Sequence, residues 1–212
     1  MKIKICGLRD AENIKAVAAL QPDLVGFICY ERSPRFIADM DADILSDISP
    51  EIQKTAVFVN ESAENINALI DKYDFDAIQL HGNESPEFAG QFLGKVTVIK
   101  AFGLDENFKF DQLKPFAGKI DYFLFDAKTA SHGGSGKTFN WDILREYKLE
   151  VPFFLSGGLS LDNLEEVKEI AHPQFYGVDL NSRFEIQPAL KDIEKLKQAF
   201  AMLKHTTNEV RS

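Results

Sequence analysis

The chain has 212 residues, of which 45% are hydrophobic, and this is enough to bury the core of one domain. Its 24 basic and 33 acidic residues give a net charge of −9, so we expect neither a nucleic acid nor an anionic membrane surface as a partner. A small anionic molecule remains compatible, because a few cations and backbone N–H groups can form a local positive site.

Short runs rich in β-branched and aromatic residues alternate along the chain with longer stretches whose apolar residues recur at helical spacing. Strands are predicted at Lys2–Cys6, Leu24–Cys29, Thr55–Val59, Ala77–Leu80, Val96–Ala101, Tyr122–Asp126, Pro152–Leu155 and Phe175–Asp179. Helices are predicted near residues 10–20, 39–48, 62–73, 85–93, 107–116, 140–147, 161–171 and 189–204, several of them opened by an Asp, Ser or Asn suited to capping.

The regular alternation of strand and helix implies parallel strands joined by right-handed crossovers. Eight such units can close into a (β/α)8 TIM barrel or, less often, form an open doubly wound sheet. No Pro/Ser-rich linker or shift in composition marks a second domain. We therefore predict an α/β fold, a single compact (β/α)8 barrel over residues 1–204, followed by a frayed polar tail over residues 205–212.

Polar residues gather where the predicted strands end. In a barrel these positions and the loops after them build one face, which is where functional groups are expected. They are Cys6, Ser33-Pro34-Arg35, Asn60, Gln79 and His81, Lys100, Asp126, Ser156-Gly157-Gly158, and Asp179, Asn181 and Ser182.

Each of these residues also has a purely structural interpretation. A lone cysteine is most often a small buried hydrophobe, and we assign Cys29 to that class. Cys6 differs, because it ends a strand beside Gly7, where its thiol can face the barrel mouth. Asp126 could stabilise a turn, and Arg35 could be an ordinary solvated cation.

Two glycine-containing segments bear on ligand binding. Gly157 and Gly158, before a predicted helix, let the backbone approach a ligand and present free N–H groups to phosphate. The run Gly133–Thr138 is not a nucleotide-binding P-loop, because Ser131 stands where that motif requires glycine. We predict instead that this run forms a mobile lid.

Metal binding and covalent catalysis through lysine have weaker support. The four histidines show no HExxH or other metal-ligand spacing, so no metal is expected. Lys100 could form a Schiff base, as lysines do in barrel aldolases, and this alternative stays open.

The cysteines and the first residues bear on cell compartment. Cys6 and Cys29 form neither a CxxC pair nor a disulfide-dense pattern. The first ten residues contain no apolar run of signal-peptide length, and no segment approaches the ~18 apolar residues of a membrane span. We expect a cytoplasmic protein.

Eight motifs, in order, give the chain a family resemblance. They are Lys4-Ile5-Cys6-Gly7, Gly26-Phe27 with Ser33-Pro34-Arg35, Val57-Phe58-Val59-Asn60, Gln79-Leu80-His81-Gly82, Asp126, Gly133–Thr138, Leu155–Gly158 and Gly177-Val178-Asp179. Together they closely resemble the phosphoribosylanthranilate isomerase family over nearly the whole chain. This resemblance implies a cofactor-free Amadori rearrangement of N-(5-phosphoribosyl)anthranilate in tryptophan biosynthesis, with that phosphosugar-anthranilate as the small-molecule partner.

The resemblance also implies roles for particular residues. Cys6 matches the general base, Asp126 the general acid and Arg35 the residue that faces the anthranilate carboxylate. The phosphate and the remaining substrate contacts are expected at Gln79, His81, Gly157, Gly158, Asn181 and Ser182. An acid at neutral pH needs a pKa well above the ordinary carboxyl value of about 3.9, and burial of Asp126 could supply that shift.

The chain departs from the family pattern at two positions after the last strand. Arg183 replaces a glycine, and we hypothesise that its charge helps bind the phosphate or the carboxylate end of the substrate. Ala189 also stands where glycine is common, which we interpret as drift of modest effect.

Three matters stay open at this point. Another phosphosugar barrel, with Lys100 rather than Cys6 as the reactive group, is one alternative. A metabolite-binding barrel that has lost its chemistry is another. The sequence also leaves open whether the protein is a monomer or a homodimer.

Overall fold

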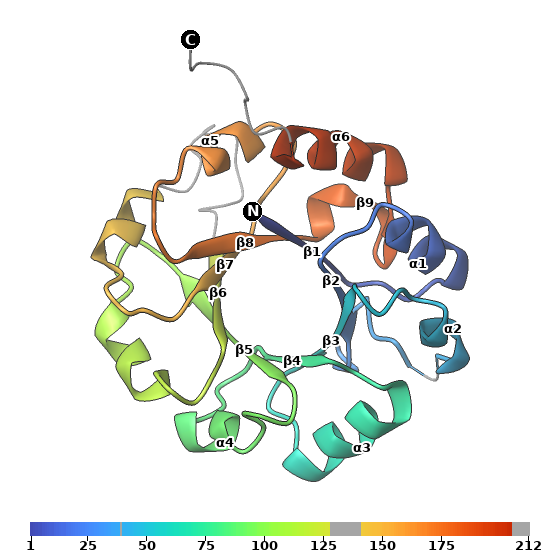
Figure 1. The fold of residues 1–212 in the computed structure, drawn as a ribbon, viewed down its shortest axis with the longest axis horizontal. Coiled ribbons are helices and arrows are strands. Elements are labelled where there is room, and N and C mark those ends of the chain that lie inside the picture. Colours follow the sequence, from blue (N-terminus) through green and yellow to red (C-terminus); the bar gives the residue numbers. More distant parts are fainter. Residues whose placement is uncertain (39, 128–140, 205–212) are drawn as a thin grey trace.

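The computed structural model describes residues 1–38, 40–127 and 141–204 (Figure 1). Parallel strands β1 to β8 pair in chain order, and β8 pairs with β1, so the sheet closes into a barrel. The strands are β1 (Lys2–Cys6), β2 (Leu24–Ile28), β3 (Gln53–Phe58), β4 (Ala77–Leu80), β5 (Thr97–Leu104), β6 (Tyr122–Ala127), β7 (Phe153–Ser156) and β8 (Phe175–Leu180). The predicted eight-stranded α/β barrel is confirmed.

Helices form an outer ring around the strands (Figure 1). The described α-helices are α1 (Ala11–Ala18), α2 (Asp43–Ser46), α3 (Ala63–Tyr73), α4 (Pro86–Gly90), α5 (Leu164–Lys168) and α6 (Ile193–Lys204), and the 3-10 helices are η1 (Phe110–Phe116), η2 (Trp141–Glu146) and η3 (Ser182–Phe184). Asp10, Ser62 and Ser85 cap α1, α3 and α4 by accepting a backbone N–H from three residues later.

The last predicted helix begins later than expected. Residues 189–204 were predicted as one helix, but α6 starts only at Ile193. Strands β9 (Glu185–Gln187) and β10 (Leu190–Lys191) form a small antiparallel hairpin before it. Ala189, in the turn of that hairpin, has φ of 68°, a left-handed conformation that a right-handed helix does not contain.

Two other predicted helices are 3-10 helices. The region predicted as 107–116 contains η1, and Pro115 inside it has no N–H to donate to a regular α-helical hydrogen bond. The described part of the region predicted as 140–147 contains η2. Short segments such as these have little helical stability of their own, so packing decides their form.

The inside of the barrel is divided into an apolar and a polar layer. Leu24, Ile99, Ala101, Leu124 and Phe154 form an apolar cluster separate from the main core. Lys4, Gln79 and Asp179 are buried polar residues, at most 4% exposed. Side chains alternate between the two faces of a strand, so Lys4 lies on the same face of β1 as Cys6. Cys6 is the residue at the carboxyl end of β1. The polar layer therefore lies next to the end of the barrel where the site is expected.

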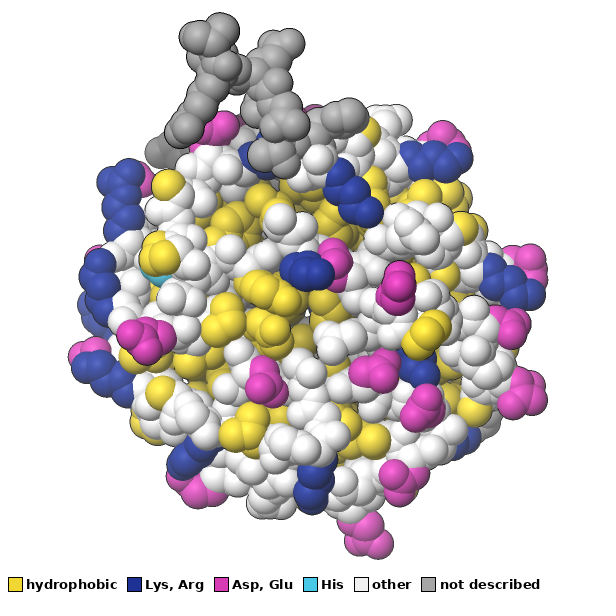
Figure 2. Space-filling view, viewed as in Figure 1, with side chains coloured by type: hydrophobic (Ala, Val, Ile, Leu, Met, Phe, Trp, Pro, Cys, Tyr) yellow, Lys and Arg dark blue, Asp and Glu magenta, His cyan; other side chains and the backbone are white. Residues whose placement is uncertain are grey.

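The described surface carries charges of both signs. In Figure 2, Lys and Arg side chains are interspersed with Asp and Glu side chains around the rim of the molecule. No helix within the described ranges has the length and apolar character needed to cross a membrane.

Candidate active site

A cavity of about 200 Å³ opens at the carboxyl ends of the strands. It is lined by Cys6, Ile28, Arg35, Val57, Gln79, His81, Asp126, Ser156, Gly157, Gly158, Leu159, Asp179, Asn181 and Ser182. These include every residue to which the family resemblance gave a role, whereas Arg183 does not line this cavity. The cavity therefore brings the Cys6 thiol and the Asp126 carboxyl, from opposite parts of the sequence, to one space.

Cys6 ends β1 and is 3% exposed, yet its side chain lines the cavity. Gly26 on the neighbouring strand β2 makes room for it, since a Cβ at Gly26 would lie 2.7 Å from the Cys6 sulfur. Burial raises the pKa of the Cys6 thiol, while the positive charges of Lys4 and Lys191 oppose that rise. Cys6 is therefore mainly a thiol near neutral pH. When it loses its proton, the charges of Lys4 and Lys191 stabilise the thiolate.

Asp126 is the penultimate residue of β6 and is paired with a histidine. One carboxyl oxygen, Oδ2, lies 3.5 Å from Nε2 of His81. The other ring nitrogen of His81, Nδ1, lies 2.8 Å from the amide nitrogen of Gln79. Because that amide nitrogen can only donate, the proton of a neutral His81 ring sits on Nε2, facing Asp126.

The expected burial of Asp126 is not provided by the described protein atoms. Its side chain is 39% exposed. The carboxyl group faces the open cavity, where a bound ligand would cover it. Any exclusion of water from Asp126 therefore depends on the substrate or on residues outside the described ranges.

Arg35 is held by a carboxylate that the sequence analysis did not single out. Its Nε and Nη2 lie 2.9 and 2.6 Å from the two oxygens of Glu185, a bidentate pair. Glu185 also accepts a hydrogen bond of 2.6 Å from Lys191, whose ammonium donates to Asn181 at 2.8 Å. Burial raises the pKa of Glu185, but Arg35 and Lys191 outweigh it and hold that pKa below its ordinary value.

The pairing fixes the orientation of the Arg35 guanidinium at the cavity wall. Glu185 lies between the last predicted strand and the last predicted helix, and Lys191 lies within that predicted helix, so neither carried a signal of this role. Their positions in the β9–β10 hairpin explain why helical spacing did not reveal them.

The loop after β7 presents its backbone to the cavity. Gly157 and Gly158 have φ of 84° and 67°, conformations that favour glycine. Asn163 stabilises this loop by donating to the carbonyl of Gly158 and accepting from the N–H of Ser160. The helix expected directly after the glycines begins only at Leu164 and ends at Lys168. The two glycines therefore lie in a well-bonded loop rather than at a helix N-terminus.

Arg183 lies apart from the other predicted site residues. It is exposed and lines a neighbouring cavity with Gly158, Ser160, Asp162 and Lys195. Gly158 borders both cavities. The described geometry thus places Arg183 beside the loop after β7 and outside the cavity that contains Cys6.

Lys100 is buried and does not line the cavity. Its ammonium donates to the carbonyls of Leu80, Gly82 and Ala101 and lies 3.2 Å from a carboxylate oxygen of Glu84. A fully engaged amine outside the cavity cannot reach a sugar bound there. This arrangement argues against the Schiff-base alternative.

Glu84 also connects two loops at the cavity edge. It accepts the backbone N–H groups of Asn60, after β3, and Gly82, after β4. With Lys100 behind it, this carboxylate holds the loop that carries His81. The loop geometry beside Asp126 therefore rests on a buried ion pair.

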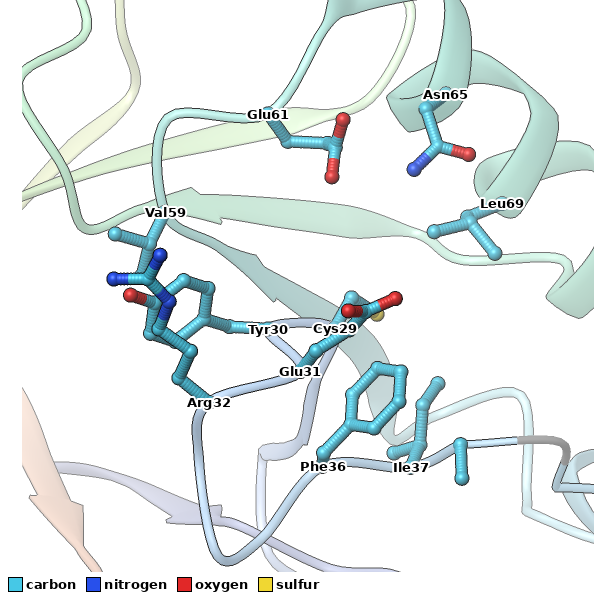
Figure 3. A pocket seen from close by; sticks show the side chains of 11 residues that line it. Cys29, Tyr30, Glu31, Arg32, Phe36, Ile37, Val59, Glu61, Asn65 and Leu69 are labelled. Carbon is cyan, nitrogen blue, oxygen red and sulfur yellow. The ribbon is translucent and has the colours of Figure 1, made fainter.

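A second cavity, of about 320 Å³, lies between the loop after β2 and helix α3. Figure 3 shows Glu61 and Asn65 on one side of this space and Tyr30 and Phe36 on the other. None of the residues predicted for the site lines it. This cavity is larger than the one that Cys6 lines, but the acid, base and cation of the predicted site are in the other one.

Two predictions concern metal binding and the lid. No group of three or more His, Cys, Asp or Glu side chains is placed to hold a metal within the ranges that the structure describes. The lid predicted at Gly133–Thr138 lies outside the described residues.

Sequence comparison gives a consistent result. The family model described as N-(5'phosphoribosyl)anthranilate (PRA) isomerase matches residues 3–202. The chain is 44% identical to N-(5'-phosphoribosyl)anthranilate isomerase of Parabacteroides distasonis, with 99% of this chain and 96% of that protein covered. It is 40% identical to the protein of the same name from Phocaeicola vulgatus, with coverages of 93% and 98%.

Solved structures agree with the sequence relatives. Phosphoribosyl anthranilate isomerase from Thermotoga maritima superposes with a TM-score of 0.85 at 29% identity, covering 97% of this chain and 100% of that one. A phosphoribosyl anthranilate isomerase in complex with reduced 1-(o-carboxyphenylamino)-1-deoxyribulose 5-phosphate gives a TM-score of 0.82 at 26% identity, with the same coverages.

Proposed function

The chain belongs to the N-(5'-phosphoribosyl)anthranilate isomerase family, and from that premise we propose that Cys6 and Asp126 are its acid–base pair. The reaction is the isomerisation of N-(5-phosphoribosyl)anthranilate to 1-(2-carboxyphenylamino)-1-deoxyribulose 5-phosphate, a step of tryptophan biosynthesis. One observation supports the assignment of roles above the others: Cys6 and Asp126 line the same cavity at the carboxyl ends of the strands.

The first step opens the furanose ring. Asp126, as general acid, donates a proton to the ring oxygen, and the bond between that oxygen and C1 breaks. The lone pair of the anthranilate nitrogen forms a double bond to C1, which gives a protonated Schiff base and an Asp126 carboxylate. His81, 3.5 Å from Asp126, is placed to donate a hydrogen bond to that carboxylate as it forms.

The second step moves a proton from carbon to sulfur. The Cys6 thiolate removes the proton from C2, and the C–H electrons form a double bond between C2 and C1 while the nitrogen recovers its lone pair. The resulting enolamine tautomerises to the ketone. Proton exchange with solvent returns Cys6 and Asp126 to their starting states, and no step takes up or releases electrons.

Binding groups at either end of the cavity orient the substrate. Arg35 can pair with the anthranilate carboxylate, because its guanidinium is fixed at the cavity wall by Glu185. The phosphate would lie at the loops after β7 and β8, against the backbone of Gly157 and Gly158 and the side chains of Asn181 and Ser182. Gln79 and His81 would contact the sugar between them.

Turnover of single variants tests the two catalytic roles. We expect Cys6→Ala and Asp126→Asn each to lower kcat by at least about 100-fold, the usual effect of losing a positioned acid or base. The change in anthranilate fluorescence on addition of the substrate measures the rate. Cys29→Ala is the matched control, since Cys29 is the buried cysteine outside this cavity.

The outcome is decisive if the variants keep the wild-type circular dichroism spectrum. Near-normal kcat in either Cys6→Ala or Asp126→Asn would refute the assignment of that residue. The same assay in the presence of a chelator tests the expectation that no metal takes part, since turnover should then be unchanged.

We also propose the extent of the domain, the cellular compartment and the oligomeric state. We propose that residues 1–204 form the single isomerase domain, that residues 205–212 are a tail, and that the protein works in the cytoplasm. One solved relative, from Thermotoga maritima, is described as dimeric. A monomer or a homodimer is proposed for this chain, and analytical ultracentrifugation distinguishes the two.

A further inference from the structure

A buried ion pair lies directly beneath the Cys6 thiol. Lys4 and Asp179 are partners across the β1–β8 seam that closes the barrel, and the Lys4 ammonium lies 2.9 Å from Oδ2 of Asp179. The side chains are 0% and 4% exposed. Lys4 precedes Cys6 by two residues on the same face of β1, so the ammonium and the sulfur are neighbours.

Stability alone does not explain this pair. Burying two charges costs desolvation free energy that their attraction often only offsets, and apolar pairs of similar size are frequently as stable. The other oxygen of Asp179, Oδ1, is buried without a hydrogen-bond partner among the described residues, although Asp179 lines the cavity. An incompletely bonded ion pair beside a proposed base suggests a role in the reaction.

Charged groups reach Cys6 from several elements. Lys4 lies on its own strand, Asp179 on β8 and Lys191 on β10, and the charge of Arg35 after β2 also acts on the thiol. Among these groups, Lys4 is the cation whose charge lowers the pKa of the Cys6 thiol most. Glu185 neutralises much of the charge of Arg35 and Lys191, because it pairs with both.

Two further ionisable groups share the cavity with Cys6. Asp126 and His81 line the same cavity as Cys6 and face each other. Lys4 is thus the cation with the most direct access to the sulfur. Burial lowers the pKa of Lys4, but Asp179 and Cys6 outweigh it and hold that pKa above its ordinary value, so Lys4 carries its charge throughout the working pH range.

Resting on the proposed role of Cys6, we propose that Lys4 is a positioning residue for the reaction: its ammonium group, anchored by Asp179, stabilises the Cys6 thiolate that removes the C2 proton. Asp179 has two opposing effects in this arrangement. It holds Lys4 in place, and its negative charge competes with the thiolate for the same ammonium. Removing Lys4 and removing the charge of Asp179 should therefore move the thiol titration in opposite directions.

A titration of the Cys6 thiol tests the proposed role of Lys4 and needs no substrate. In a Cys29→Ala background, the rate of alkylation by iodoacetamide against pH reports the Cys6 thiolate alone. We expect Lys4→Met to raise the midpoint by at least about one pH unit and Asp179→Asn to lower it by about one unit, as expected for losing an opposite and a like charge nearby. Lys2→Met is the matched control, because Lys2 lies on the same strand but pairs with Asp23 at the surface.

Opposite shifts separate positioning from a structural role, which would only lower stability in both variants. An unchanged or lowered midpoint in Lys4→Met would overturn the proposal. If Lys4→Met does not fold, the titration of Asp179→Asn tests the proposal. A raised or unchanged midpoint of the Cys6 titration in Asp179→Asn would also overturn it. The rising limb of kcat/KM against pH should move with the thiol midpoint in each variant.

The turnover assay can refute the role of Cys6 independently of the thiol titration, which tests the role of Lys4. If Cys6→Ala retained normal turnover, the proposed base would be wrong while the thiol midpoints still reported the action of Lys4. If Cys6→Ala were inactive and the midpoints did not move, Cys6 would remain the base without help from Lys4.

Discussion

At the scale of single residues, the cavity depends on carboxylates and lysines that are far from their partners in sequence. Arg35 and Glu185 are 150 residues apart, and Lys4 and Asp179 are 175 residues apart. Each of these charges is paired with an opposite charge on a different element of the fold. The orientation of Arg35 and the state of Cys6 therefore depend on tertiary structure rather than on local motifs.

Glu185→Gln should weaken both substrate binding and stability. Arg35 loses its charged partner, so we expect KM to rise about tenfold with a smaller change in kcat. At pH 7 the free energy of unfolding should fall by about 2 kcal/mol, since a charge-assisted buried contact is lost. Urea denaturation measures this free energy of unfolding. Glu194→Gln is the control, because Glu194 forms an exposed ion pair with Lys197.

The pH dependence of that difference follows from the lowered pKa of Glu185. A carboxyl whose pKa is lower in the folded state stabilises the fold above its ordinary value, here 4.5, and loses that contribution as the pH falls through the folded value. The difference in free energy of unfolding between wild type and Glu185→Gln should therefore become smaller below about pH 4.5. A gap that stayed constant or widened with acid would contradict the role given to Glu185.

The predicted site residues were recoverable because they stand at strand ends. Cys6, Gln79 and Asp126 each lie where a strand meets a loop, and the barrel brings those positions to one face. Glu185 and Lys191 were not singled out, and Lys4 was named only as part of a motif, because a buried ion pair between distant segments leaves no periodic pattern in sequence. Arg183 was predicted from a motif position, and its exposed side chain lies in the neighbouring cavity.

At the scale of elements, strands were predicted more accurately than helices. All eight barrel strands were predicted within a few residues of their observed bounds, because short runs rich in β-branched and aromatic residues mark them in the sequence. Several helices are only four or five residues long, as in α2, α4 and α5. Apolar spacing continues past such helices into turns that pack against the same core, so it overestimates their length.

The turn of the β9–β10 hairpin gives a prediction at this scale. Ala189 has φ of 68°, where a Cβ is disfavoured and glycine is not. We therefore expect Ala189→Gly to stabilise the protein by about 1 kcal/mol, which is the reverse of the usual effect of glycine. The midpoint of urea denaturation measures the change, provided that the slope is unaltered.

Ala201→Gly is the matched control for that experiment. Ala201 is exposed within α6, where glycine should cost about 0.5–1 kcal/mol. A loss of stability in Ala189→Gly equal to that in Ala201→Gly would show that the hairpin turn is not in the left-handed conformation. The interpretation of Ala189 as harmless drift would then be correct.

At the scale of the whole molecule, barrel closure and charge distribution together make the site. The net charge is −9, and charges of both signs are mixed around the rim in Figure 2. Arg35 nevertheless lines the cavity and Lys4 and Lys191 lie behind its wall, so an anionic substrate meets a local positive site in an acidic protein. Pairing of β8 with β1 is what brings Asp179 and the hairpin beside Cys6.

The central claim is that Cys6 and Asp126 act on one sugar bound between them. A crystal structure of this chain with reduced 1-(o-carboxyphenylamino)-1-deoxyribulose 5-phosphate, the compound in a solved relative, tests it most directly. We predict that the Cys6 sulfur lies within about 4 Å of C2 and that an Asp126 oxygen lies within about 3.2 Å of the C4 oxygen, which is the ring oxygen of the substrate. A sugar in contact with only one of the two side chains, or bound in the cavity of Figure 3, would contradict the claim.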